Sequence, residues 1–150
     1  MSLIYERLQE KYIPELGEMF TQYNPGDERD EGYVHDPEQV KKFLVEPQNI
    51  AFVAILDDKV IGCIFGYSMT MIDEVAKEFY IYGVDIHPDY HSKGYGTEFM
   101  KYVLKWVKEN GFRYASVPTG SDNLAACRCY EKAGMEMDDW KKARSFVVKY

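Results

Sequence analysis

The stretch VDIHPDYHSKGYGTEFM, residues 84–100, joins two kinds of secondary structure within a few residues. An alternating apolar run ends at Pro88, and a helical stripe of apolar residues begins soon after it. Between them lies the segment HSKGYG, residues 91–96, with two glycines two positions apart beside a lysine. Glycine lets a backbone approach a ligand closely, and the unpartnered N–H groups of a helix N-terminus attract anions. The stretch therefore predicts a strand, a phosphate-binding turn and a helix start.

The composition suits one compact domain over residues 1–150, because 46% of the chain is hydrophobic and 15% is aromatic. Lys and Arg total 18 against 25 for Asp and Glu, so the formal charge is −7 and no basic face for nucleic acid is evident. No apolar run approaches the roughly 18 residues that span a membrane, and no signal peptide opens the chain. We expect a cytoplasmic protein without nucleic-acid or membrane partners.

Cysteine and histidine spacing does not predict a metal site. Cys63, Cys127 and Cys129 are an odd number without a CxxC pair, which favours reduced thiols over a disulfide or zinc site. His87 and His91 are four apart, but a proline turn lies between them. We therefore expect no metal.

Periodicity and turn signals predict the element order ααβββαβαββ, an α/β fold with a mixed sheet and helices on its faces. Pro14 opens a first helix, and Asp36 caps a second with Pro37 at its first helical position. The remaining elements are a hairpin over 50–69, strands over 77–86 and 112–118, helices over 96–110 and 123–133, and final strands over 135–140 and 143–150.

Two well-known phosphate-binding motifs do not fit the glycine turn. The dinucleotide fingerprint needs a third small residue where this chain has Phe99, and the P-loop needs a Gly-Lys-Ser/Thr triplet that the chain lacks. Both of these phosphate-binding motifs are therefore disfavoured.

Two segments of the chain, HSKGYG at residues 91–96 and NLAACRCYEKAGM at residues 123–135, resemble two linked motifs of the GNAT superfamily of acyl-CoA-dependent N-acyltransferases. The first motif, (Gln/Arg)-x-x-Gly-x-(Gly/Ala) after a strand, is matched at Ile86, Pro88, Lys93, Gly94 and Gly96, while His91 replaces the usual Gln or Arg. The second lies in NLAACRCYEKAGM, residues 123–135, and is matched at Asn123, Ala126, Tyr130, Glu131, Lys132 and Gly134. One predicted helix and one strand separate the motifs, as the family arranges them.

The resemblance implies a GNAT-like fold with a mostly antiparallel sheet, splayed fourth and fifth strands, and acetyl-CoA as co-substrate. The pantetheine arm would bond to the strand edge from Val84 to Ile86, as an added strand does. Asn123 would bond the pantetheine or hold the following helix. The pyrophosphate would rest on the turn, with Lys93 adding positive charge; the implied residues are His91, Ser92, Lys93, Gly94, Tyr95, Gly96 and Thr97.

For catalysis, the resemblance implies that Tyr130 is the general acid that protonates the departing thiolate. The base stays open. The family's usual glutamate would stand at Tyr82 or Tyr80, so Tyr82, Asp85 or a water chain would take the proton. Strand alternation points Asp85 away from Val84 and Ile86, unless a bulge re-aims it.

The acceptor implied by the resemblance is a primary amine, on a small molecule or a protein. An acidic run at residues 27–31 would attract a cation, and Tyr33, His35 and Tyr80 are candidate acceptor contacts. The resulting hypothesis is an acetyl-CoA-dependent N-acetyltransferase that works by direct attack in a ternary complex. The alternatives are a non-catalytic acyl-CoA-binding or sensing module and an enzyme for another phosphate ligand. Pairing of two copies into a homodimer through the C-terminal strands is compatible with the fold.

Overall fold

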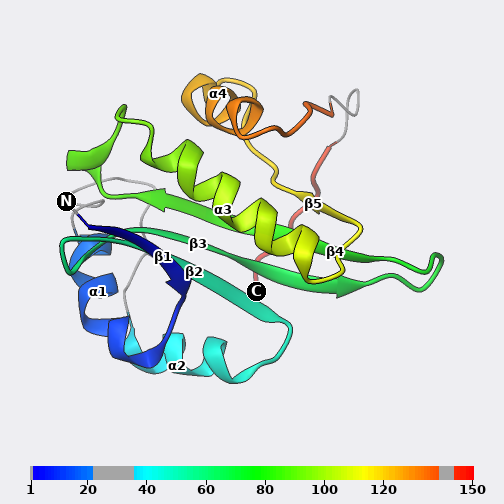
Figure 1. Ribbon diagram of the computed structural model, residues 1–150. Coiled ribbons are helices and arrows are strands. Elements are labelled where there is room, and N and C mark those ends of the chain that lie inside the picture. The colour runs from blue at the N-terminus through cyan, green and yellow to red at the C-terminus, as the bar shows by residue number, and fades with distance from the viewer. Residues whose placement is uncertain (1, 22–35, 139–143) are drawn as a thin grey trace.

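The computed structural model describes residues 2–21, 36–138 and 144–150, and contains a five-stranded sheet with helices against both faces (Figure 1). The strands lie in the order β1-β2-β3-β4-β5, and neighbours are antiparallel except β4 and β5, which are parallel. The mixed, mostly antiparallel sheet is therefore confirmed. The strands are β1 (Leu3–Arg7), β2 (Asn49–Leu56), β3 (Lys59–Thr70), β4 (Lys77–Ile86) and β5 (Tyr114–Ser116). The sequence prediction missed β1, whose residues LIYER show no apolar–polar alternation.

The described residues form four α-helices: α1 (Ile13–Thr21), α2 (Pro37–Val45), α3 (Tyr95–Glu109) and α4 (Leu124–Lys132). Short 3-10 turns cover Glu10–Tyr12 and Pro88–Tyr90. The predicted cap of α2 is confirmed, because the Asp36 carboxylate accepts a hydrogen bond from the Glu38 N–H at 3.0 Å. The predicted stripe of α3 is buried at Phe99, Met100, Val103 and Val107.

The core consists of two clusters, one on each face of the sheet. Strand β2 contributes to both because alternate residues of a strand point to opposite faces. Phe52 and Ala54 join the cluster beneath α3, whereas Val53 joins the cluster with Leu16 and Met19 of α1. Helices α1 and α2 therefore cover one face of the sheet and α3 covers the other.

Strand β4 contains the feature that positions the candidate site. Ile81 pairs with Gly66 of β3 and Gly83 pairs with Phe65, so Tyr82 is an extra, bulged residue. Because of this bulge, Ile81 and Val84, three residues apart, both contact the α3 cluster. Strand β5 pairs only with Glu78–Tyr80 of β4. In the described part of the chain, the second half of β4 thus has no strand on its β5 side, which is the predicted splay.

The two predicted C-terminal strands do not form where the structure describes them. Residues 135–138 and 144–150 have no regular secondary structure, although their composition favours strands. A strand needs a neighbour for its peptide groups, and 144–150 have no ladder partner among the described residues. Tyr33, His35 and the acidic run at 27–31 lie outside the described residues. Among the helices that are described, none has the length and hydropathy to cross a membrane.

Candidate active site

A cleft of about 590 Å³ lies where the end of β4, the N-terminus of α3 and one side of α4 meet. It brings together Val84 and Ile86, residues 91–92 and 94–97 of the glycine turn, and Tyr130. Sequence reasoning missed Ala125, Arg128 and Cys129 in its wall. Their spacing of three and four residues places them on one side of α4, so helical periodicity around Tyr130 could have found them.

At the start of α3, the glycine turn leaves open space beside the backbone and N–H groups that can donate to a ligand. Gly94 caps the helix at φ +84°, and a Cβ at this position would have no atom within 4 Å, so the backbone conformation rather than crowding favours glycine. Gly96 differs, because a Cβ there would stand 3.4 Å from the Cys129 sulfur. The first intrahelical bond runs from the Glu98 N–H to the Gly94 carbonyl at 3.1 Å. The N–H groups of residues 95–97 precede that bond and suit an anion.

Both histidines near the turn make hydrogen bonds to the backbone of the same segment. His87 is buried, and its Nδ1 accepts a hydrogen bond from the Asp89 N–H at 3.1 Å; burial lowers its pKa. The Nε2 of His91 lies 2.6 Å from the Ile86 carbonyl oxygen, and the His91 N–H donates to the Pro88 carbonyl. His91 is one of the residues implied to hold the pyrophosphate, but its backbone N–H is already bonded within the turn. No group of three metal-ligating side chains occurs among the described residues.

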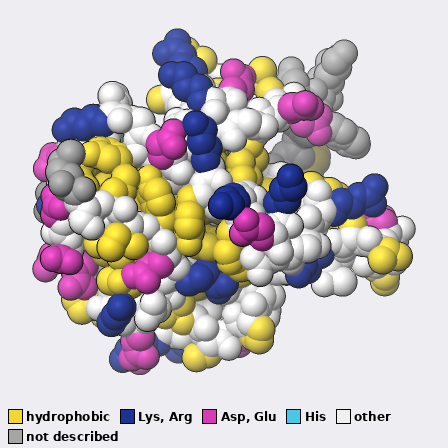
Figure 2. Space-filling model, in the orientation of Figure 1, with side chains coloured by type: hydrophobic (Ala, Val, Ile, Leu, Met, Phe, Trp, Pro, Cys, Tyr) yellow, Lys and Arg dark blue, Asp and Glu magenta, His cyan; other side chains and the backbone are white. Residues whose placement is uncertain are grey.

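The electrostatics of the cleft suit an anionic ligand, although the chain is acidic overall. Arg128 and Lys132 of α4 line it, and Lys93 lies in an adjoining hollow with Lys101 and Lys132. In the face drawn in Figure 2, Lys and Arg side chains run from the top of the molecule, where α4 lies, towards α3. Asn123 instead caps α4, since its side chain accepts a hydrogen bond from the Ala126 N–H at 3.1 Å, and it does not line the cleft.

Tyr130 and Asp85 are two titratable groups with altered acidity near the splay. Burial raises the pKa of Tyr130 to about 12, with smaller contributions from Cys129 and Asp85. A phenol with this pKa keeps its proton at neutral pH and can donate it. Burial likewise raises the pKa of Asp85 to about 6, so this carboxylate is ionised at neutral pH but binds a proton readily.

Asp85 faces the α1 and α2 side of the sheet, as alternation predicts. It pairs in register with Cys63, a member of the α1 cluster. Tyr82 projects from the bulge with 68% of its side chain exposed and contacts the rings of Phe65 and Tyr67. Tyr80 lies opposite Tyr67 in the ladder. Asp85, Tyr82 and Tyr80 therefore lie along β4. Tyr130 lies on α4, in the cleft at the end of that strand.

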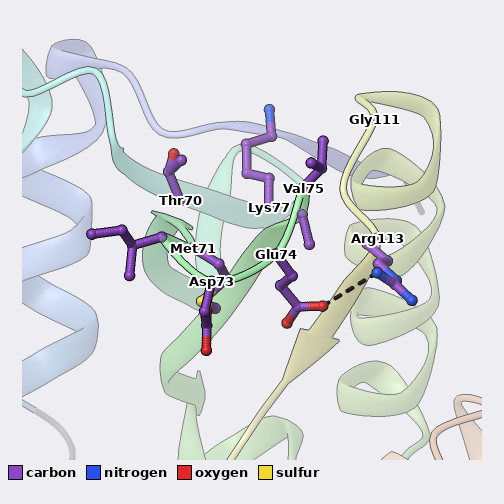
Figure 3. Close-up of a pocket in the computed structure, with 10 residues that line it drawn as sticks. Thr70, Met71, Asp73, Glu74, Val75, Lys77, Gly111 and Arg113 are labelled. Carbon is purple, nitrogen blue, oxygen red and sulfur yellow. Dashed lines mark hydrogen bonds and ion pairs between the residues drawn. The ribbon is translucent and has the colours of Figure 1, made fainter.

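A second hollow lies at the other end of β4, around the β3–β4 hairpin (Figure 3). Two of its charged groups already pair with each other, because Glu74 lies 3.2 Å from Arg113, and Glu74 also accepts a hydrogen bond from the Tyr114 hydroxyl at 2.7 Å. It has no helix N-terminus, and its lining contains none of the residues of the two sequence motifs. The cleft at the splay is the better candidate site.

The chain belongs to the acetyltransferase (GNAT) family, whose model matches residues 6–135. Its fold is also found in solved structures of low sequence identity. An aminoglycoside acetyltransferase, meta-AAC0020, from an uncultured soil metagenomic sample in complex with sisomicin is 20% identical, with a TM-score of 0.82 over 98% of this chain and 97% of that one.

Two further structures align over nearly all of both chains. A GNAT family acetyltransferase from Staphylococcus aureus is 18% identical, with a TM-score of 0.75 and full coverage of both chains. A transcriptional regulator from Bacillus halodurans is 15% identical, with a TM-score of 0.79 over 99% of this chain and 100% of that one. These similarities establish the fold, and the family match establishes the class of acetyltransferase.

Proposed function

We propose that the protein transfers an acetyl group from acetyl-CoA to a primary amine by direct attack in a ternary complex. The observation that supports this most is the single cleft that joins the glycine turn, the unpaired edge of β4 and Tyr130. The pyrophosphate would lie on the N–H groups of residues 95–97, with Lys93, Arg128 and Lys132 adding positive charge. The pantetheine arm would bond to the edge of Val84 to Ile86, which has no β5 partner.

In the proposed reaction the amine approaches from the α1 and α2 side of the sheet, where Asp85 lies. The Asp85 carboxylate takes a proton from the ammonium, directly or through a water molecule, and the free amine attacks the thioester carbonyl. A backbone N–H of β4 stabilises the oxyanion. Collapse of this adduct breaks the carbon–sulfur bond, and Tyr130 gives its proton to the departing CoA thiolate. The amide nitrogen still carries its second proton and returns it to the Tyr130 phenolate, directly or through a water molecule. The acidity of the two groups suits these opposite roles.

The acceptor class is narrowed by charge and by the related structures. The chain has a formal charge of −7, which favours a cationic amine over an anionic one. One related structure is an aminoglycoside acetyltransferase in complex with sisomicin. We therefore propose a cationic small-molecule amine and place aminoglycosides first among the compounds to test, followed by polyamines and amino acids.

The decisive test is thiol release from acetyl-CoA with this amine panel, with calorimetry of CoA binding measured alongside. Release that depends on one class of amine supports the proposal and identifies the acceptor. CoA binding without release from any amine, including protein amines, would instead support a non-catalytic acyl-CoA sensor. Absence of CoA binding would reject both functions and the assignment of the cleft.

A further inference from the structure

Four aromatic side chains contact one another in a closed circuit on the α1 and α2 side of the sheet. Phe43 of α2 lies edge-on to Phe65 and Tyr67 of β3, with ring centroids 5.8 and 6.0 Å away. Tyr82 of β4 closes the circuit, with its ring centroid 5.7 Å from that of Phe65 and 6.1 Å from that of Tyr67. Phe43 and Phe65 pack against the α1 cluster, which fixes the side of the sheet on which the rings lie. We call these four side chains the aromatic wall.

Tyr82 is the exposed member of the aromatic wall. Its side chain is 68% exposed, whereas the other three rings are partly buried. Because Tyr82 is the extra residue of the β4 bulge, its ring projects from the ladder and contributes little to folding by burial. A large ring that is supported by three others and kept in water provides a surface for an interaction.

Gly83 allows the aromatic wall to reach the Asp85 carboxylate. Gly83 lies opposite Phe65 in the ladder, and a Cβ at Gly83 would overlap the Phe65 ring. The ring therefore lies across β4, in the place that a side chain at position 83 would take. Asp85 is two residues further along the same face of the strand. A ligand whose amine lies at Asp85 can thus place its next atoms against Phe65 and Tyr82.

The shape of the aromatic wall suits a flat ligand. The planes of Phe65 and Tyr82 are inclined by only 40°, so these two rings form a shallow surface and not a slot. A flat ring covers more of such a surface than an acyclic chain does. It therefore gains more from dispersion and from the removal of apolar surface from water.

Charge at the aromatic wall favours a cation, because the faces of aromatic rings attract positive charge. Among the described residues, no Lys or Arg side chain lies over a ring of the wall. The rings that do have such a side chain over them are Phe52, Trp106, Tyr12, Tyr90 and Phe112. The described cations of the chain therefore do not compete for the wall, and Asp85 supplies a carboxylate beside it.

We propose that Tyr82 and Phe65 determine the choice of acceptor, by holding a flat ring that carries the reacting amine while this amine reaches Asp85. Two kinds of compound share that chemistry. An amino sugar presents the CH face of a saturated ring, and an arylalkylamine presents an aromatic ring. An acyclic polyamine has the charge but no flat ring. Tyr82 positions the acceptor and transfers no proton. This inference rests on the proposed acetyl transfer and narrows its acceptor.

The test measures kcat and KM at saturating acetyl-CoA for kanamycin, phenethylamine and putrescine, which are an amino sugar, an arylalkylamine and an acyclic diamine. The unaltered protein should prefer a ring-bearing amine to putrescine. Tyr82→Ala should raise the KM for that amine roughly tenfold, because the stacking surface is lost. Its kcat should stay within about twofold, since the contact is the same in the ground and transition states. Tyr82→Phe keeps the ring and should retain the KM of the unaltered protein.

Tyr114→Ala is the matched control, because Tyr114 is a tyrosine of the neighbouring strand β5 whose hydroxyl bonds Glu74 at the hairpin. Its KM should be unchanged, and calorimetry should find the same CoA affinity in all of these variants. A larger KM change for kanamycin supports a saturated ring in the natural acceptor, and a larger change for phenethylamine supports an aromatic one.

Three results would overturn the inference while acetyl transfer itself is observed. They are an unchanged KM in Tyr82→Ala, an equal rise of KM in Tyr82→Phe and Tyr82→Ala, and a preference of the unaltered protein for putrescine over both ring-bearing amines. An equal rise would show that the hydroxyl and not the ring holds the acceptor. Absence of transfer to every amine by the unaltered protein would instead reject the proposed function, and this inference with it.

Discussion

The two halves of β4 form one continuous strand but have different partners. Residues Glu78–Tyr80 have a strand on each side, whereas Ile81–Ile86 pair only with β3 among the described residues. The paired half follows a hairpin in which Glu74 bonds Arg113 and Tyr114. The half without a β5 partner carries the bulge, the half-buried Asp85 carboxylate and one wall of the cleft. The difference teaches that where the β4–β5 ladder ends, the peptide groups on that edge of β4 are left available for a ligand, as the proposed function requires.

The difference between the two halves of β4 is tested most directly by neutralising one carboxylate in each half. Asp85→Asn should lower turnover by roughly 10²- to 10⁴-fold, the range for loss of a general base. Glu78→Gln should leave turnover within about twofold, because Glu78 bonds Ser116 in the paired half. Steady-state thiol release measures both. Equal losses in the two variants would remove the functional distinction between the halves, and unchanged turnover in Asp85→Asn would assign the base elsewhere.

The turn that follows the unpaired half can be tested with two glycines of similar conformation. Gly94→Glu should weaken CoA binding roughly hundredfold, because its side chain and charge enter the proposed pyrophosphate site. Gly111→Glu is the control: Gly111 has φ +78°, close to the +84° of Gly94, and both have open space where a Cβ would be. Backbone strain is therefore similar in the two variants. Calorimetry that found the same CoA affinity in both would reject the turn as the phosphate site.

A smaller effect is expected at Tyr130, across the cleft from β4. Tyr130→Phe should reduce turnover by roughly ten- to hundredfold and leave CoA affinity nearly unchanged, since only the proton donor is removed. Tyr95→Phe, which alters another tyrosine of the same cleft, should retain turnover. If the two variants have the same activity, Tyr130 has a packing role.

The smallest effect concerns stability and pH. Burial raises the pKa of Asp85 from 3.8 to about 6, so the folded protein binds this proton more tightly than the unfolded chain. The resulting stabilisation is present below about pH 4 and is lost as pH rises through 6. Between pH 4 and 7 the free energy of unfolding should fall by about 2 kcal/mol relative to Asp85→Asn. Denaturation at several pH values measures this difference, and parallel curves would contradict it.

Local signals predicted most of this fold from sequence. The cap at Asp36, the helical stripe of α3 and the alternation along β4 each act over a few residues, and each element forms where it was expected. The two motifs likewise indicated Gly94, Gly96 and Tyr130, which meet in one cleft.

Features that depend on distant partners could not be predicted. The bulge at Tyr82 is visible only in the pairing of β4 with β3, and the altered acidity of Asp85 arises from burial against other elements. The C-terminal strands failed for the same reason: a strand-forming composition does not specify which edge it joins. The close contact between Cys129 of α4 and Gly96 of α3 could not be predicted either, because it depends on how these two helices pack.

Because of that close contact, the Cys129 thiol can be used to measure whether the cleft is occupied. Of its three cysteines, Cys63 is buried, Cys127 lies outside the cleft lining and Cys129 lines the cleft. A ligand in the cleft should therefore slow alkylation of Cys129 while the rate at Cys127 stays the same, with Cys127 as an internal standard in one mass spectrum. Occupancy of the cleft can thus be followed by thiol labelling in the unaltered sequence, without any acceptor and without turnover.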